Sequence, residues 1–223
     1  MIRELAHLAL HTPRTLALLR RLPQHELYAT LIARADADGL AARRRDLVAG
    51  LTGHIVEIGA GTGAMFPHYP ADVRVTAVEP DQQFAGLAHA AAAEAVATID
   101  VVPGTAEAIP LADGSADAAV VALVLCSVAS VDAACRELAR VVCPGGQVRF
   151  LEHVRSPGRI AGPLMKLVDP AWVRLNRQGC HLARDPLPAI EAAGLAIDRV
   201  EPFQLWSAGL PAFPMRLIFA TRS

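Results

Sequence analysis

The chain has 223 residues, of which 53% are hydrophobic and 19% are charged, and its formal net charge is −1. A chain of this length can bury the core of one domain, and its composition excludes a disordered protein. The nearly neutral charge gives no reason to expect a nucleic-acid partner, which requires a basic face. Its 4 cysteines lack C-x-x-C spacing, so we expect neither a zinc cluster nor a disulfide framework.

Residues 1–50 carry helical periodicity without strand signals. We expect them to form a helical cap on a domain that spans residues 51–223. The N-terminus shows no continuous apolar stretch of the kind found in signal peptides, and the longest apolar run is too short to cross a bilayer. The sequence therefore predicts a cytoplasmic protein without stable membrane insertion.

From residue 54 onward, strand patterns alternate with helical patterns. Such alternation predicts an α/β fold, in which helices cover both faces of a parallel sheet. Residues 155–184 are rich in Pro, Gly and Arg, and we expect them to form an insertion that covers the active face. The last two strands are close enough in the chain to form a hairpin, which would give the sheet an antiparallel edge. The expected strands are 54–58, 73–79, 99–103, 117–125, 147–154, 196–203 and 215–222, and the expected helices are 62–69, 82–97, 131–142 and about 185–194.

The most informative stretch is residues 56–63, an apolar strand with an acidic residue followed by three glycines at alternate positions. Glycine lets the backbone turn sharply and approach a ligand closely. A helix that begins there would point its free N–H groups into the turn. Glu79 ends the next apolar run, and a carboxylate roughly 20 residues after such glycines usually binds a nucleoside ribose. The pattern therefore predicts an adenine nucleoside cofactor.

Two cofactor classes compete for this pattern. A nicotinamide dehydrogenase would show G-x-G-x-x-G/A, which Gly59, Gly61 and Ala64 satisfy. Glu57, however, lies in the strand just before the turn, where it would repel a pyrophosphate and attract a cofactor with ammonium and sulfonium groups. We therefore expect S-adenosylmethionine as the cofactor. The alternatives are NAD-dependent oxidoreduction and a non-catalytic cofactor-binding module.

From about residue 28 onward, the chain resembles the class I S-adenosylmethionine-dependent methyltransferases. Within them it is most similar to the methyltransferase-like group that includes the alkyl-thiol methyltransferases. The resemblance implies a Rossmann-like fold with a mostly parallel seven-stranded sheet and a soluble enzyme, because the apolar N-terminal anchor of the animal members is absent. The superfamily motifs are residues 56–63, 78–80, 104–110, 113–117 and 138–146, and the group motifs are 63–70, 123–128, 151–154, 169–172 and 179–182.

The resemblance assigns one set of residues to the methionine half of the cofactor. Glu57 would lie near its ammonium group, and Leu123 would offer its backbone carbonyl to that group. Tyr28 would fold over the cofactor from the helical cap, or would instead belong to the core. The loop residues that would line the methionine moiety are Gly59, Ala60, Gly61 and Gly63.

A second set is assigned to the adenosine half. Glu79 would accept hydrogen bonds from both ribose hydroxyls, one on each carboxylate oxygen. Pro80 would shape the adenine slot, which Ala106 would border through its backbone. Thr105 stands where related enzymes often have an aspartate, so the contact with the adenine amino group would weaken here or move to Glu107.

The expected reaction is S-methylation of a small apolar thiol, with an oxygen, nitrogen or carbon acceptor in a secondary metabolite or quinone as the alternative. Methyl transfer from a sulfonium depends mainly on alignment, and a thiol with a pKa of about 8.5 needs little help to ionise. His153 follows the fifth strand and is the expected proton acceptor, or else it only hydrogen-bonds the adjoining loop. We expect no metal. The residues expected to contact the acceptor are Cys126, His153, Asp169, Trp172 and His181. The alternatives are inert core positions for Cys126 and Cys180, lid packing for Trp172 and a turn or cap role for Asp169.

Overall fold

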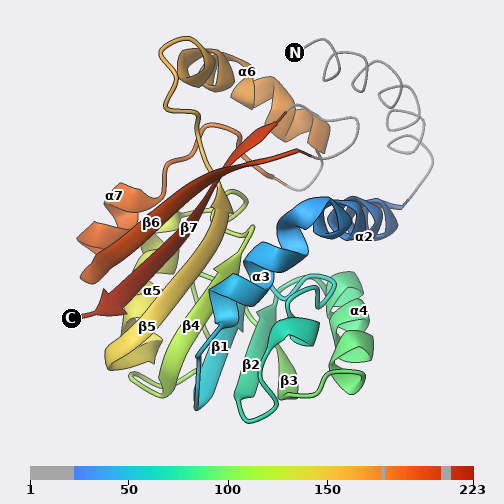
Figure 1. The fold of residues 1–223 in the computed structure, drawn as a ribbon, viewed down its shortest axis with the longest axis vertical. Coiled ribbons are helices and arrows are strands. Elements are labelled where there is room, and N and C mark those ends of the chain that lie inside the picture. The colour runs from blue at the N-terminus through green and yellow to red at the C-terminus, as the bar shows by residue number, and fades with distance from the viewer. Residues whose placement is uncertain (1–22, 177–178, 207–211) are drawn as a thin grey trace.

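The computed structural model describes residues 23–176, 179–206 and 212–223 (Figure 1). Seven strands form one sheet in the order β3-β2-β1-β4-β5-β7-β6. Strands β1 to β5 pair in parallel, whereas β7 runs antiparallel to both β5 and β6. The expected parallel sheet with an antiparallel C-terminal pair is confirmed. The strands are β1 His54–Ile58, β2 Arg74–Glu79, β3 Thr98–Pro103, β4 Ala116–Ala122, β5 Val142–His153, β6 Leu195–Leu205 and β7 Phe213–Arg222.

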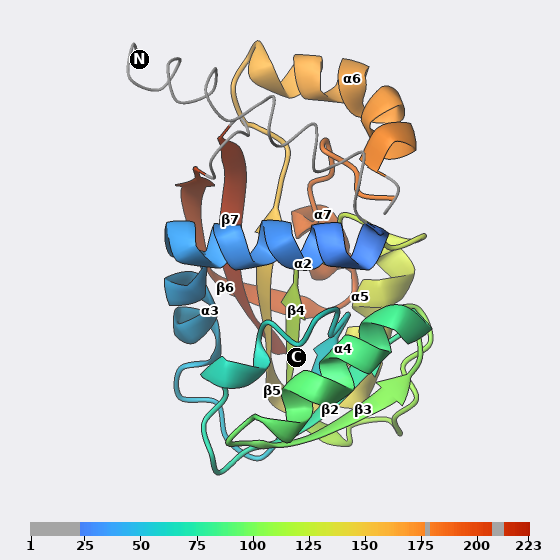
Figure 2. The ribbon, with the colours of Figure 1, turned by 90° about the vertical axis from the view of Figure 1, so that its right-hand side faces the viewer.

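Helices lie on both faces of this sheet and beyond the C-terminal ends of its parallel strands. Figures 1 and 2 show α2 crossing above the strand ends, with α6 farther out on the same side. The helical elements are α2 Gln24–Ala35, η1 Asp36–Leu40, α3 Ala41–Val48, η2 Phe66–His68, α4 Gln82–Ala93, α5 Val131–Val141, α6 Ala161–Asn176 and α7 Leu187–Ala192.

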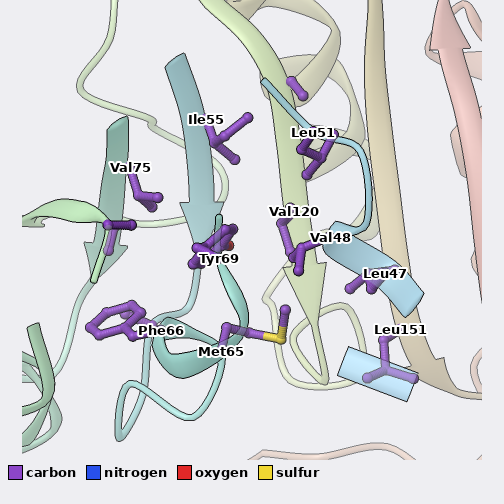
Figure 3. Close-up of a cluster of buried hydrophobic side chains, with 14 of the residues drawn as sticks. Leu47, Val48, Leu51, Ile55, Met65, Phe66, Tyr69, Val75, Val120 and Leu151 are labelled. Atoms are coloured by element: carbon purple, nitrogen blue, oxygen red, sulfur yellow. The ribbon is translucent and has the colours of Figure 1, made fainter. Parts of the chain in front are cut away.

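The core has two layers because successive strand residues point to opposite faces of the sheet. Ile55 packs in one layer with α3, α4 and the loop after β1, and Val56 packs in the other with α5 and α7. Both faces of the central strands β1, β2 and β4 are therefore buried, as the continuous apolar runs predict, whereas the edge strand β3 is half-buried or exposed. Figure 3 shows the first layer, whose labelled side chains are Leu47, Val48, Leu51, Ile55, Met65, Phe66, Tyr69, Val75, Val120 and Leu151.

The described part of the N-terminal cap is joined to the sheet by a buried cation. Arg149, on β5, donates hydrogen bonds from Nη1 to the carbonyl oxygens of Leu47 and Ala49, both at 2.8 Å. These carbonyls lie at the C-terminus of α3, where a positive charge is favourable. Residues 1–22 of the expected cap lie outside the described residues.

The expected helix over residues 62–69 is wrong. The chain forms consecutive turns there and then the short 3₁₀ helix η2. Gly63 has a φ of 76°, which ends any helical path, and Pro67 has no N–H to continue one. Hydrogen bonds of the i to i+3 type replace an α-helical ladder, such as Phe66 N–H to the Gly63 carbonyl at 3.0 Å.

Other differences concern the ends of elements and one helix that the sequence did not predict. The glycines at 145 and 146 lie inside β5, in an irregular stretch where the pairing with β4 shifts register, and do not separate a helix from a strand. Residues 155–184 contain α6, which includes Pro170. Its apolar spacing is helical, but Leu164, Leu167 and Leu175 are exposed, so this stripe is not a core face.

Candidate active site

A cavity of about 550 Å³ opens at the C-terminal ends of the five parallel strands, β1 to β5. Loops that leave parallel strands converge at this edge, which is where ligands bind in open α/β sheets. The cavity is lined by Gln24, Tyr28, Ile58, Gly59, Gly61, Val78, Glu79, Pro80, Asp81, Phe84, Gly104, Thr105, Ala106, Glu107, Leu123, Val124, Cys126, Ser127, Val128, Ala129, His153 and Cys180.

The glycine loop forms one wall of the cavity and depends on residues without a Cβ atom. Gly59 has a φ of 70°, and a Cβ added there would lie 2.6 Å from Cγ2 of Val124. Gly63 also has a positive φ, and its Cβ would lie 2.6 Å from that of Ala91. Gly59 and Gly61 line the cavity, whereas Gly63 lies behind the loop and serves its packing.

Glu79 connects the glycine loop to the start of α4. Its Oε2 accepts a hydrogen bond from the Gly61 N–H at 2.7 Å, and its Oε1 accepts one from the Asp81 N–H at 3.0 Å. Burial raises the pKa of this carboxyl, and the two backbone donors oppose that rise. Each oxygen keeps a second lone pair for a ligand hydroxyl.

Glu57 lies behind the glycine loop and does not line the main cavity. Tyr69 donates a hydrogen bond to its Oε2 at 2.8 Å, and burial raises the pKa of Glu57 to about 8. Glu57 and Ala60 line a separate small cavity of about 20 Å³, together with Arg44 and Tyr28. This volume has room for about one water molecule.

The turn after β4 is strained and is held by a buried carboxyl group. Leu123 has a φ of 63°, a conformation that non-glycine residues rarely adopt. Glu152, on β5, accepts the N–H groups of Val124 and Leu125 on Oε1 at 2.9 and 3.1 Å. Burial raises the pKa of Glu152 to about 8, and its Oε2 has no hydrogen-bond partner among the described residues. Glu152 was not among the residues predicted for the site, because an acidic residue inside a strand pattern does not show what it faces.

The far end of the cavity is bordered by the loop after β3. Thr105, Ala106 and Glu107, the residues expected near the adenine, all line it. The carboxylate of Glu107, however, is already engaged, because its Oε1 accepts the N–H groups of Ala129 at 2.8 Å and Ser130 at 3.2 Å. These contacts stabilise the start of α5. An adenine amino group that contacted Glu107 would therefore share its carboxylate with the backbone N–H groups at the start of α5.

Tyr28 reaches the cavity from α2 and packs against Phe84, which was not among the residues predicted for the site. Its ring contacts Phe84 edge-on, with centroids 5.3 Å apart and an interplanar angle of 78°. A Cβ at Gly61 would lie 3.7 Å from Cε1 of Tyr28, so the tyrosine lies over the glycine loop. Burial raises the pKa of Tyr28 well above its ordinary value, which keeps the phenol protonated.

Two cysteines and one histidine meet where the cavity reaches β5. His153 Nε2 lies 2.9 Å from Sγ of Cys180, and Cys126 completes a group whose Sγ and ring nitrogen atoms lie within 4.8 Å of one another. Burial lowers the pKa of His153, but Cys126, Glu152 and Asp169 outweigh it, so that the pKa is raised. A hydrogen bond with Cys126 lowers the pKa of Cys180. This end of the cavity carries the groups suited to handling an acceptor's proton.

The other residues expected to contact the acceptor lie outside the cavity lining. Asp169 Oδ2 lies 2.7 Å from Nδ1 of His181, and Trp172 is half-buried on α6. The N–H of His181 donates to the carbonyl of Cys126 at 2.8 Å. Asp169 and His181 thus hold the segment that carries Cys180, a residue that lines the cavity.

Known proteins resemble this chain in sequence and in fold. A methyltransferase-domain family model matches residues 56–150. The human thiol S-methyltransferases TMT1A and TMT1B are 34% and 35% identical to it, over 74% and 78% of this chain and 72% and 76% of their own. The structure of a geranyl diphosphate methyltransferase in complex with S-adenosylmethionine superimposes with a TM-score of 0.66 at 16% identity, covering 88% of this chain and 90% of that one.

These similarities agree with the geometry of the site. Among the described residues, no helix combines the length and the apolar character that crossing a bilayer requires. The similarity extends over most of both chains, and the glycine loop, Glu79 and the strained turn after β4 all border one cavity. The chain therefore belongs to the class I S-adenosylmethionine-dependent methyltransferases, is an enzyme that uses S-adenosylmethionine as its cofactor, and is related to the thiol S-methyltransferases.

Proposed function

We propose that this enzyme transfers the methyl group of S-adenosylmethionine to the sulfur of a small apolar thiol. The observation that carries the proposal is the similarity of this chain to two human thiol S-methyltransferases over about three quarters of the chain's length. The position of His153 in the cavity lining supports the proposal. An alkyl thiol with a pKa of about 8.5 needs only modest help to lose its proton near neutral pH, and an imidazole can provide it.

In this proposal the cofactor lies along the main cavity with its adenosine near β2 and β3. Glu79 accepts the ribose hydroxyls, and Pro80, Thr105, Ala106 and Glu107 border the adenine. Their common position at the strand ends supports this arrangement, since all of them line the cavity. The ring of Tyr28 covers the cofactor from α2.

The methionine half then lies against the glycine loop and the turn after β4. Gly59 and Gly61 contact it directly, Ala60 and Gly63 maintain the loop, and the carbonyl of Leu123 accepts a hydrogen bond from the ammonium group. Glu57 acts on that ammonium from behind the loop, through the cavity of about 20 Å³, which has room for about one water molecule. The ammonium group of the cofactor would favour ionisation of Glu57, whose pKa burial raises to about 8, whereas a pyrophosphate would oppose it.

The acceptor end of the cavity is assigned to the groups around His153. The methyl group faces Cys126 and His153, which line the cavity beyond Leu123. His153 promotes ionisation of the acceptor, while Asp169, Trp172 and His181 support the segment that closes this end. Alignment of sulfur, methyl group and nucleophile supplies most of the acceleration, because holding both reactants in line makes a bimolecular step effectively unimolecular.

The test is the release of S-adenosylhomocysteine when alkyl thiols, phenols, catechols and quinones are offered side by side to the purified enzyme. We expect turnover with thiols alone. A His153→Ala variant should lose rate while retaining S-adenosylhomocysteine binding, and the exposed His89→Ala variant serves as the matched control. Turnover confined to oxygen or carbon acceptors would contradict the thiol assignment.

A further inference from the structure

We propose that Cys126, His153 and Cys180 bind a zinc ion whose fourth position receives the sulfur of the acceptor thiol. The binding of the acceptor sulfur to the ion rests on the proposed thiol methylation, whereas the metal site itself does not. The three side chains come from the turn after β4, the end of β5 and the segment after α6. Their spacing in the sequence gives no metal motif, and folding alone brings them together.

The separations between the ligand atoms suit a tetrahedral ion. Zn–S bonds of about 2.3 Å and Zn–N bonds of about 2.0–2.1 Å place neighbouring ligand atoms roughly 3.5–3.8 Å apart. The atoms here span a range around that value, from 2.9 Å between His153 Nε2 and Cys180 Sγ to at most 4.8 Å within the group. Small side-chain rotations are therefore sufficient to coordinate the ion.

The backbone around the ligands is held in place by several hydrogen bonds. The side chain of Asn176 accepts the Cys180 N–H at 3.2 Å and donates to the Cys180 carbonyl at 2.7 Å. The His181 N–H joins this segment to the Cys126 carbonyl at 2.8 Å. Ligands on a preorganised backbone lose little conformational freedom when the ion binds.

The donor set and its charge favour zinc over harder cations. Two thiolates and one imidazole are soft or borderline ligands, which magnesium and calcium do not prefer. The two thiolates neutralise the charge of Zn²⁺, so burial of the group carries no net charge. All three side chains line the methyl-transfer cavity, which leaves the fourth position open, as in catalytic zinc sites.

An ion at this position would make the acceptor nucleophilic without a separate base. The acceptor thiol loses its proton to solvent as its sulfur binds the zinc, because the metal lowers the pKa of a coordinating thiol. A lone pair on that sulfur then forms the new S–CH₃ bond while the sulfonium C–S bond breaks, which releases S-adenosylhomocysteine. The product is a neutral thioether, a poorer ligand than a thiolate, so it dissociates. The zinc is neither oxidised nor reduced.

The surroundings of His153 predict a zinc affinity low enough for a chelator to compete with the site. Nδ1 of His153 is buried and has no hydrogen-bond partner among the described residues. In zinc proteins such a partner typically contributes about 10–100-fold to metal affinity. We therefore expect a chelator to remove the zinc while the binding of S-adenosylhomocysteine persists.

The experiment measures metal binding separately from catalysis. The full-length protein, prepared without chelator, is equilibrated with zinc, desalted and analysed for metal content, and the chelated protein is titrated with Co²⁺ while thiolate-to-cobalt charge-transfer absorption is recorded. We expect about one metal ion per chain, the stoichiometry of a mononuclear site. Cys126→Ser and Cys180→Ser should weaken binding at least about tenfold. The matched control is Cys143→Ser, because Cys143 lies at the opposite end of β5.

The outcomes separate this inference from the proposed function. Wild-type protein that retains no zinc and shows no cobalt–thiolate absorption would overturn the metal site, whether or not the variants fold. Thiol turnover that is unaffected by complete zinc removal would overturn the role of the ion and leave thiol methylation standing. Zinc binding without turnover of any thiol would support the metal site and overturn both the acceptor role and the proposed function.

Discussion

Glu79 performs two tasks, because it holds the backbone at Gly61 and Asp81 and also borders the cavity. We predict that Glu79→Gln weakens S-adenosylhomocysteine binding by about 10- to 100-fold, since a hydrogen bond to a charged group contributes about 1.5–3 kcal/mol. Isothermal titration calorimetry measures this change, and Glu94→Gln, at the exposed end of α4, is the control. Wild-type affinity in Glu79→Gln would refute the ribose assignment.

The raised pKa of Glu152 predicts that the free energy of unfolding depends on pH. Its pKa is raised to about 8 in the folded protein and is about 4.3 in an unfolded chain, so between these values the folded state binds more protons. The free energy of unfolding contributed by Glu152 therefore falls as pH rises through this window. Glu152→Gln keeps an oxygen for the Val124 and Leu125 N–H groups and does not titrate. We expect its stability to decline less between about pH 5 and pH 8.

Urea unfolding at several pH values tests this, with the exposed Glu191→Gln as the control. Glu57 has the same raised pKa, so a smaller decline should remain in Glu152→Gln. Parallel curves for wild type and Glu152→Gln would show that the Glu152 carboxyl is ionised in the folded state.

At the scale of elements, three glycines separate three effects. These are backbone strain at Gly145 in β5, steric conflict at Gly59 in the loop after β1, and helix propensity at Gly86 in α4. Gly145 has a φ of 78° with nothing within 4 Å of an added Cβ, so Gly145→Ala measures backbone strain alone, about 1–2 kcal/mol. Gly59→Ala adds a Cβ 2.6 Å from Val124, and we expect it to cost more and to abolish cofactor binding. Gly86→Ala, in α4 with open space around it, should stabilise by about 0.4–1 kcal/mol.

Thermal unfolding with and without S-adenosylhomocysteine ranks the three glycine variants. If Gly59→Ala lost no more stability than Gly145→Ala and still bound the ligand, the contact with Val124 would not matter, and the loop would tolerate a side chain. The three positions together distinguish strain, steric conflict and helix propensity within one protein.

At the scale of the whole molecule, the cofactor should stabilise the fold, because the main cavity is built from the ends of five strands and from α2. A ligand at 100 times its dissociation constant adds about 2.7 kcal/mol of stability. For a domain of this size we expect S-adenosylhomocysteine to raise the melting temperature by about 5–10 °C. NAD at the same concentration should leave it unchanged. Equal stabilisation by both ligands would reopen the question of nucleotide specificity.

Local patterns determined most of the fold. Alternating apolar strands and helices predicted the parallel sheet, since a strand buried on both faces must be apolar throughout. The same patterns misjudged residues 62–69, where positive φ at Gly63 and the missing N–H of Pro67 outweigh helical propensity. They also missed α6, whose apolar residues are exposed and so do not mark a core face.

The sequence by itself determined the cofactor class, and it predicted which end of the sheet carries the main cavity. The glycines and Glu79 are near their partners along the chain, and a β-α-β unit has a single favoured hand. Only the tertiary structure decided that Glu57 lies behind the loop, that Glu152 holds the turn after β4, and that Cys126, His153 and Cys180 meet. These groups are far apart in the sequence, and side-chain contacts between separate strands and segments depend on packing and leave no periodic signal in the chain.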